Sequence, residues 1–170
     1  GQVRVEPELA FVLGRDLPAR AQAYSHAEVE SAIAKVHLAL ELIDSRYDDQ
    51  AELTFVDRLA DGLVNQGLWL GPEVPWQQAS QAQAFAVEWS VGEEAGTTLT
   101  GRHPNDNPLL PLYWLVDHLR AKGQGLQAGQ VVITGSYAGT FPCPVDQDLS
   151  FTYGDLGRFK VRFHARCPMR

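Results

Sequence analysis

The sequence is poor in several features whose scarcity excludes whole classes of protein. Its 170 residues include two cysteines, Cys143 and Cys167, too few for a disulfide scaffold or a thiolate zinc site, so we expect reduced thiols. It has no run of Lys and Arg, and 14 basic against 21 acidic residues give a net charge of −7. Nucleic acid is therefore not an expected partner, because phosphate binding needs clustered cations.

Long apolar runs are also missing. No stretch approaches the roughly 18 consecutive apolar residues that a membrane span requires, and the N-terminus lacks a basic region followed by an apolar one. We therefore expect no membrane association and a cytoplasmic protein. With 45% apolar residues, the chain is long enough for one domain with a core and too short for two, so residues 1–170 are expected to form a single domain.

The first half of the chain predicts a strand followed by a helix. Residues 3–13 are rich in strand formers, with Pro7 at an irregular or edge position. Ser25 and Glu28 have the spacing of a capping box, which predicts a helix from there to about Leu42. The apolar positions at spacings of three and four that support this helix are Val29, Ile33, Val36, Leu40 and Ile43. A short helix is expected within residues 51–63.

The second half predicts several strands and one more long helix. Alternating apolar residues indicate a strand over 85–91, and a second strand is expected over 97–100. A helix is expected from about Pro108 to a stop at Gly123, followed by strands over 131–134, 149–153 and 159–163. This order indicates an α+β fold with a largely antiparallel or mixed β-core and two main helices.

Three glutamates are candidate ligands for a hard cation. Glu6 and Glu8 lie at i and i+2 of the expected strand, which places both carboxylates on one face. Carboxylate oxygens suit Mg²⁺, Mn²⁺ or Ca²⁺, but two would leave the shell incomplete. Glu41 is the candidate third ligand, since a carboxylate near the C-terminal end of a helix is disfavoured unless a cation is nearby. The alternative is an ordinary solvated acidic surface.

Longer motifs around these glutamates resemble the fumarylacetoacetate hydrolase superfamily, in its 2-keto-4-pentenoate hydratase and 4-oxalocrotonate decarboxylase branch. The resemblance covers nearly the whole chain in four blocks. They are Glu6–Gly14, Ala39–Arg46, Gly101–Pro104 with Leu112–Leu115, and Ala128–Ser136 with Gly139 and Thr140. The implied fold is that of the superfamily's C-terminal catalytic domain.

The resemblance implies that Glu6, Glu8 and Glu41 bind Mg²⁺ or Mn²⁺. It also implies a lyase that hydrates a short unsaturated 2-hydroxy or 2-oxo acid, such as 2-hydroxypenta-2,4-dienoate from aromatic-ring degradation. A divalent cation would stabilise the negative charge that develops on such an acid. Family members generally form dimers or larger assemblies, so a homo-oligomer is expected, with a decarboxylase or hydratase as a further potential partner.

Other polar residues have both a functional and a structural interpretation. The turn at Thr134, Gly135 and Ser136 could offer hydroxyls and N–H groups to an anionic substrate, or could be a strand exit that needs glycine. His103, before Pro104, could be a titrating base or an ordinary loop histidine. Asp61 matches an acidic position of the family's substrate side, and we take it with His103 as a candidate catalytic residue.

Two departures from the family pattern favour other functions. Family members have a segment ahead of the first glutamate pair that contributes a lysine, whereas here Gly1 lies five residues before Glu6. After Asp61, the residues at 62–64 are Gly, Leu and Val where the family has Asn, Ala and Ser. The alternatives are a non-catalytic or partner-dependent relative, a 2-oxo-acid decarboxylase of the same branch, and an acylpyruvate hydrolase, which would need a His-Glu arrangement that the sequence lacks.

Overall fold

The computed structural model describes residues 1–48 and 51–165, so Cys167 lies outside the described residues. The helices are α1 (His26–Glu30), α2 (Phe55–Ala60), α3 (Trp76–Ala79) and α4 (Leu110–Ala121). The strands are β1 (Gln2–Leu13), β2 (Ile33–Ile43), β3 (Asn65–Val74), β4 (Ala84–Val91), β5 (Thr97–Arg102), β6 (Val131–Ile133), β7 (Phe141–Pro144), β8 (Leu149–Tyr153) and β9 (Gly157–Val161). No helix of the described chain is long and apolar enough to cross a membrane.

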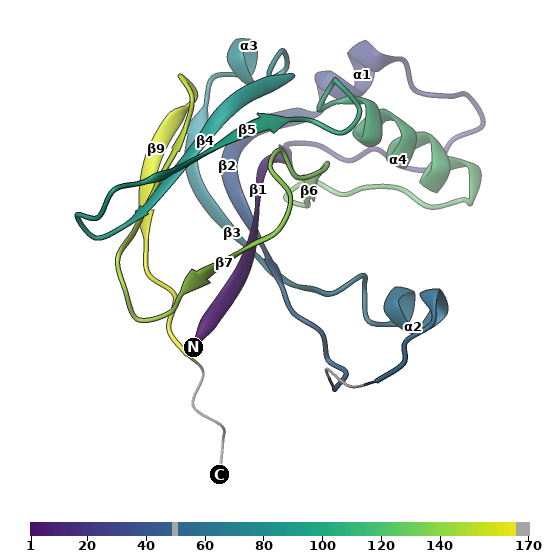
Figure 1. The fold of residues 1–170 in the computed structure, drawn as a ribbon. Helices are drawn as coiled ribbons and strands as arrows, with labels where there is room; N and C mark the ends of the chain where they lie inside the picture. Colours follow the sequence, from purple (N-terminus) through teal and green to yellow (C-terminus); the bar gives the residue numbers. More distant parts are fainter. Residues whose placement is uncertain (49–50, 166–170) are drawn as a thin grey trace.

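Two antiparallel sheets form the body of the molecule (Figure 1). The first has five strands in the order β3-β2-β1-β6, with β7 also paired to β1, and the second has four in the order β5-β4-β8-β9. Apolar side chains from both sheets form one core, which includes Leu9, Phe11, Val87, Phe151 and Tyr153. The α+β class with a largely antiparallel β-core is therefore confirmed.

The expected long helix over 25–42 is wrong in all but its first turn. Ser25 and Glu28 do form the capping box, yet α1 ends at Glu30 and the chain continues as β2. In β2, Val36, Leu38 and Leu40 alternate toward the core, so their period of two prevails over the spacing of three and four. Pairing with β1 and β3 satisfies the backbone of this segment from both sides. The fold thus has one long helix, α4, instead of two.

Pro7 lies in the middle of β1 without costing the sheet a hydrogen bond. On the side away from β2, β6 pairs with residues 10–12 and β7 with residues 2–5, which leaves a gap beside Pro7. Its carbonyl accepts a 2.9 Å hydrogen bond from the Tyr137 N–H, so its nitrogen faces this same gap. Pro7 therefore lies at an edge only locally, because the side of β1 away from β2 is unpaired at this point in the middle of the strand.

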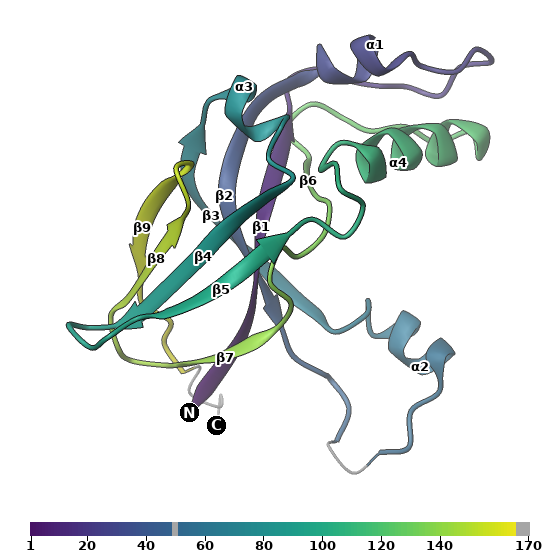
Figure 2. The same cartoon turned by 45° about the horizontal axis from the view of Figure 1, so that its top comes forward.

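The remaining expected elements agree closely with the structure. The helix predicted up to Gly123 is α4, and Gly123 follows it with a φ of 71°, a conformation that glycine adopts without strain. The helix α4 lies beside α1 at one end of the sheets (Figure 2). The strands β3 and β7 had no clear sequence signal, because β3 carries two glycines and a proline and β7 carries two prolines.

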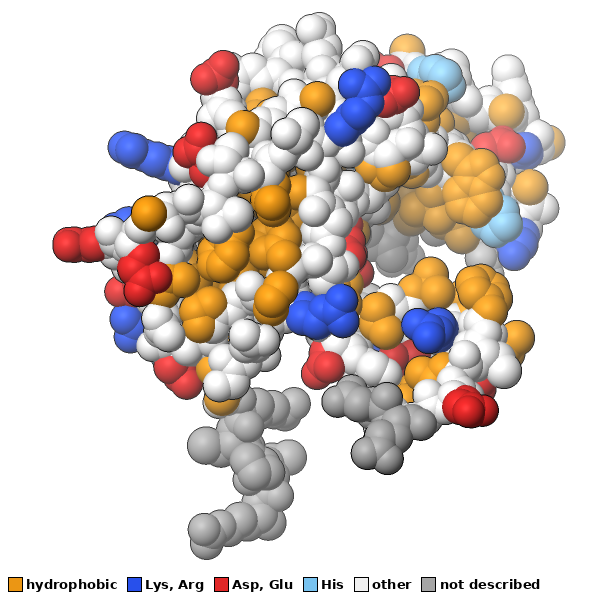
Figure 3. Space-filling model, in the orientation of Figure 1, with side chains coloured by type: hydrophobic (Ala, Val, Ile, Leu, Met, Phe, Trp, Pro, Cys, Tyr) orange, Lys and Arg blue, Asp and Glu red, His pale blue; other side chains and the backbone are white. Residues whose placement is uncertain are grey.

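The helix α2 stands away from the sheets on an extended arm (Figures 1 and 2). None of its residues is buried, and Phe55, Val56 and Leu59 are all more than half exposed. Figure 3 shows hydrophobic side chains gathered on the surface of the arm. The arm returns to the body through β3 and so forms one side of the hollow beside β1 and β2.

A buried hydrogen bond from Tyr153 joins the second sheet to the first. Tyr153 is fully buried, and its hydroxyl donates a 2.7 Å hydrogen bond to the Ala39 carbonyl on β2. We expect Tyr153→Phe to lower the free energy of unfolding by about 1–2 kcal/mol, because the buried carbonyl loses a partner. Urea unfolding measures this loss. Tyr24→Phe removes a similar 2.8 Å bond at an exposed site and should cost less, so equal costs would contradict the role given to Tyr153.

Candidate metal centre

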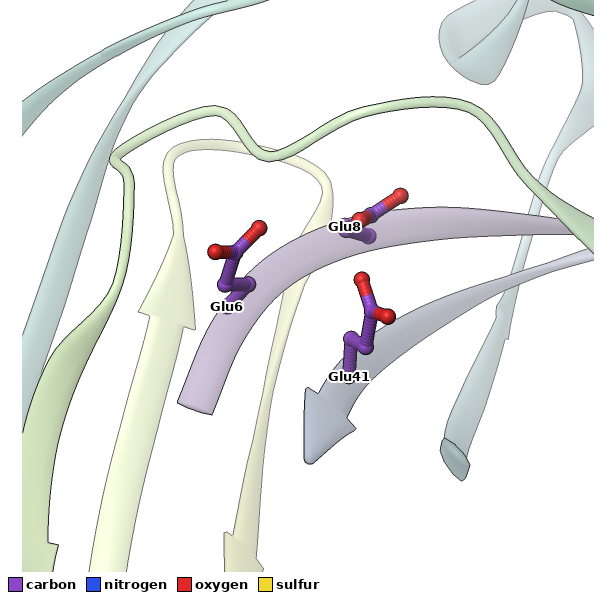
Figure 4. A group of neighbouring side chains, drawn as sticks. All are labelled: Glu6, Glu8 and Glu41. Carbon is purple, nitrogen blue, oxygen red and sulfur yellow. The ribbon is translucent and has the colours of Figure 1, made fainter. Parts of the chain in front are cut away.

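The register of β1 and β2 brings three carboxylates to one place. Glu6 lies directly opposite Glu41 in this antiparallel pair, and Glu8 follows Glu6 by two residues. Residues that are paired across two strands, or separated by two along one strand, project from the same face. All three side chains therefore leave the sheet on the face away from the core (Figure 4). Glu41 is on a strand, so its expected place at a helix end is wrong. It nevertheless lies beside Glu6 and Glu8, as expected.

The geometry of the cluster fits a hard divalent cation. One carboxylate oxygen from each glutamate lies within 4.8 Å of the other two. Two glutamates paired directly across strands repel each other, and this costs stability unless a cation lies between them. Carboxylate oxygens alone favour Mg²⁺, Mn²⁺ or Ca²⁺ over softer metals. The residues present therefore fit the ion that the sequence implied.

Each glutamate is also oriented by a donor from another part of the chain. The Gly135 N–H donates a 2.8 Å hydrogen bond to Glu8, and the Asn65 side-chain amide donates a 2.6 Å bond to Glu41. The Thr140 hydroxyl donates to Glu6. Such outer contacts fix the direction of ligand oxygens. The cluster is therefore held from two directions, by residues 135 and 140 and by the first residue of β3.

Glu8 is the most deeply buried member of the cluster, with 2% of its surface exposed. Burial raises its pKa from 4.5 to about 8, the Gly135 N–H acts in the opposite direction, and the nearby Glu41 and Glu6 carboxylates raise it further. A buried carboxylate among like charges is an uncommon arrangement for a purely structural residue. A bound cation would reverse this effect and keep Glu8 ionised.

The cluster lies in a cleft of about 790 Å³ between the first sheet and the α2 arm. Apolar side chains contribute Ile43, Leu53, Leu63, Val64 and Ile133 to its wall. Its polar lining consists of Arg4, Glu6, Glu8, Glu41, Asp44, Ser45, Asp48, Arg58, Asn65 and Thr140. The volume is typical of a small-molecule site, and its lining is mainly polar, with five large apolar side chains among the polar groups.

Asp61 lies behind this wall and not in it. It is 5% exposed, and the Arg46 guanidinium donates a 2.9 Å hydrogen bond to its carboxylate and a 2.7 Å hydrogen bond to its backbone carbonyl. The hydrogen bond from Arg46 lowers the pKa of Asp61 below its usual range. These contacts close the base of the arm, so Asp61 positions the residues that follow it.

His103 and Thr134 lie together beside Gly135, whereas Ser136 contacts Gly139. His103 is buried, its Nδ1 accepts from the Asn105 N–H at 3.2 Å, and burial lowers its pKa. The Thr134 hydroxyl lies 3.4 Å from His103 Nε2, and the Ser136 hydroxyl donates to the Gly139 carbonyl at 3.2 Å. The turn therefore connects His103 to Glu8 through Gly135, while Ile133 and Thr140 are the residues of this region that line the cleft.

The run that departs from the family pattern forms part of the cleft wall. Gly62, Leu63 and Val64 have φ angles of 69°, 55° and 67°, all in the left-handed region. This region suits glycine and costs a leucine or a β-branched valine on the order of 1–3 kcal/mol each. Both strained residues contact the cleft, so the altered run shapes the space in which a ligand would lie.

The sequence did not reveal the donors that orient the glutamates. Thr140 and Gly135 lie in a recognised motif, and Asn65 ends the altered run, but nothing in the spacing of these residues connects them to positions 6, 8 and 41. Gly135 and Thr140 are more than a hundred residues from the glutamates to which they donate, so these contacts depend on the folded path of the chain. The one sequence signal for these donors was the glycine at position 135. The structure explains this glycine, because a φ of 138° and the close approach of Pro104 leave no room for a side chain.

Comparisons with known proteins agree with this fold. The family profile described as fumarylacetoacetate (FAA) hydrolase C-terminal matches residues 1–163. The chain is 33% identical over 135 residues to 2-keto-4-pentenoate hydratase 1 of Dechloromonas aromatica, covering 79% of this chain and 50% of that protein. It is 29% identical to 2-oxo-hept-4-ene-1,7-dioate hydratase of Escherichia coli, covering 94% of this chain and 61% of that protein.

Solved structures share the fold. The 4-oxalocrotonate decarboxylase of Pseudomonas putida G7, complexed with magnesium and adipate, superposes with a TM-score of 0.74 at 21% identity, over 95% of this chain and 60% of that one. The fumarylpyruvate hydrolase of Pseudomonas aeruginosa, in complex with Mn²⁺ and pyruvate, gives 0.60 at 18% identity, over 98% and 67%. The chain spans one half to three fifths of the length of the two curated relatives. With the profile covering almost all of its residues, the chain belongs to the fumarylacetoacetate hydrolase family.

Proposed function

We propose that this chain is the metal-binding part of a hydratase, a carbon–oxygen lyase that adds water to a short unsaturated 2-hydroxy or 2-oxo acid such as 2-hydroxypenta-2,4-dienoate. The observation that carries the proposal is the register of Glu6 opposite Glu41, with Glu8 beside them at the cleft. The curated relatives named as hydratases support the choice of reaction.

In this proposal the three glutamates hold Mg²⁺ or Mn²⁺, and Thr140, Gly135 and Asn65 keep their carboxylates in place. The bound cation supplies positive charge where negative charge develops on the 2-oxo acid. The apolar wall of the cleft, including Ile43, Leu63 and Ile133, would contact the carbon chain of the acid and displace water from it.

Proton transfer requires further groups. Asp61 and His103 remain our candidates, with Thr134 and Ser136 as candidate substrate contacts. In the described chain none of these four side chains lines the cleft, so they would act through Arg46 or the Gly135 turn, or after a rearrangement. Lysine and histidine are likewise missing from the described lining of the cleft.

That composition of the lining favours a second candidate function. A chain that binds the cation but places no lysine or histidine beside it in the described lining would be a non-catalytic or partner-dependent relative, with that group coming from another segment or subunit. A homo-oligomer, or a complex with a decarboxylase or hydratase, would provide such a group. A 2-oxo-acid decarboxylase is a third candidate, because it would use the same cation.

A direct assay tests the proposal. We expect the purified chain to remove the conjugated absorbance of 2-hydroxypenta-2,4-dienoate at least about tenfold faster with Mn²⁺ than with EDTA, because the cation stabilises the developing charge. Release of CO₂ from 2-oxohex-3-enedioate is the parallel measurement for a decarboxylase. A folded chain that binds Mn²⁺ and changes neither compound would contradict catalysis by this chain alone and favour the partner-dependent function.

A further inference from the structure

The segment of residues 134–140 carries two of the three donors that orient the glutamates. The Gly135 N–H donates to Glu8, and the Thr140 hydroxyl donates to Glu6. Neither donor belongs to a helix or a strand, since both lie between β6 and β7. A segment outside the sheet ladders needs other contacts to hold its donors in place.

Tyr137 lies between these two donors and is anchored through three polar groups. Its N–H donates a 2.9 Å hydrogen bond to the carbonyl of Pro7, which separates the two glutamates of β1. Its carbonyl accepts a 2.8 Å bond from the Arg102 N–H at the end of β5. Its hydroxyl donates a 2.6 Å bond to the Ala82 carbonyl, just before β4. Tyr137 therefore connects segment 134–140 to both sheets.

The side chain of Tyr137 is enclosed by the core. It is 3% exposed, and its ring packs against Phe85 with the ring centroids 4.2 Å apart. On another side it meets the His103 ring edge-to-face at 5.3 Å. A buried hydroxyl bond is costly to leave unmade, and a ring packed by two others has little freedom to turn. The place of this side chain is therefore fixed, and the backbone that carries it is fixed with it.

We propose that Tyr137 is a positioning residue of the metal centre. Its buried hydroxyl bond fixes segment 134–140, so that the two donors of the segment reach their carboxylates. Tyr137 is not among the described residues that line the cleft, so it acts through these donors and does not contact a ligand there. The cation depends on such contacts, because ligand oxygens that are free to turn bind it less tightly. This inference rests on the proposed function, because it takes the glutamates to be the ligands of the cation.

The variant Tyr137→Phe tests the inference, because it removes the hydroxyl and keeps the ring. Calorimetric titration of the full chain with Mn²⁺ should show roughly tenfold weaker binding, the lower end of the loss of about 10–100-fold that follows removal of an outer contact. A purely structural tyrosine would lower stability to urea and leave the Mn²⁺ affinity of the folded protein unchanged.

The matched control is Tyr113→Phe. It removes another 2.6 Å hydrogen bond from a tyrosine hydroxyl, here to Glu30 on α1 and outside the cleft. Its Mn²⁺ affinity should equal that of the wild type.

Double variants locate the effect of Tyr137. Thr140→Val removes a donor that Tyr137 holds in place, so Tyr137→Phe should weaken Mn²⁺ binding less in this background than in the wild type. Asn65→Ala removes the donor to Glu41, which comes from β3 and not from segment 134–140. In that background the loss caused by Tyr137→Phe should be undiminished.

The inference is overturned if Tyr137→Phe binds Mn²⁺ as the wild type does, if Tyr113→Phe weakens binding equally, or if Thr140→Val leaves the effect of Tyr137→Phe unchanged. If circular dichroism shows that Tyr137→Phe does not fold, Phe85→Leu takes its place. This variant loosens the packing of the Tyr137 ring and keeps the hydroxyl, so weaker binding is again expected and unchanged binding overturns the inference. A folded wild type that does not bind Mn²⁺ would remove the proposed function as well, whereas a wild type that binds it, with unaffected variants, removes this inference alone.

Discussion

Replacing Glu41 with glutamine is expected to lower the affinity for Mn²⁺ by at least about 100-fold and to remove most metal-dependent turnover. The change takes one of three charged oxygens from the cluster and leaves the side chain the same size. The new amide oxygen can still accept the hydrogen bond from Asn65, so the strand pairing should remain. Calorimetric titration with Mn²⁺ and the hydratase assay measure the two losses.

The matched control for this variant is Glu88→Gln. Glu88 is an exposed glutamate on β4, in the second sheet, and its replacement makes the same change in charge far from the cluster. Its Mn²⁺ affinity should equal that of the wild type. If Glu41→Gln also binds Mn²⁺ as the wild type does, Glu41 is not the third ligand and the proposed centre is incorrect.

Replacing Glu8 with glutamine is expected to stabilise the metal-free protein at pH 8 and to have little effect at pH 4.5 or below. The folded-state pKa of Glu8 is about 8, above its ordinary value of 4.5, so between these values the folded chain holds a proton that the unfolded chain has released. The free energy of unfolding therefore falls as pH rises through this window. Glutamine stays neutral and avoids that loss, with an expected gain of about 1–3 kcal/mol at pH 8.

Added Mn²⁺ should reverse the order of the two proteins at pH 8. The wild type gains stability because the cation binds the folded state and keeps Glu8 ionised, whereas Glu8→Gln gains much less. Thermal unfolding in EDTA and in Mn²⁺, at the two pH values, measures all four conditions. A Glu8→Gln variant that is less stable than the wild type in EDTA at pH 8 would show that Glu8 has a different role in the metal-free fold.

Much of the fold follows from local patterns. The strand formers of residues 2–13, the capping box at Ser25 and the apolar spacing of α4 with Gly123 at its end each depend on neighbours within a few residues. Glu41 was added to the Glu6 and Glu8 pair from its expected place at a helix end, which is wrong, and the family motifs independently implied the same residue. The course of the segment after Glu30 could not be predicted in this way, because its apolar residues fit both a helix and a strand.

The sequence by itself determined that Glu6 and Glu8 share one face of a strand, that the β-core is largely antiparallel and that the chain resembles a metal-dependent family. Only the tertiary structure decided that Glu41 lies opposite Glu6 on β2, because β1 and β3 complete the hydrogen bonds of that segment on both sides. It also decided which donors orient the glutamates. These contacts join residues far apart in sequence, and no local pattern contains them.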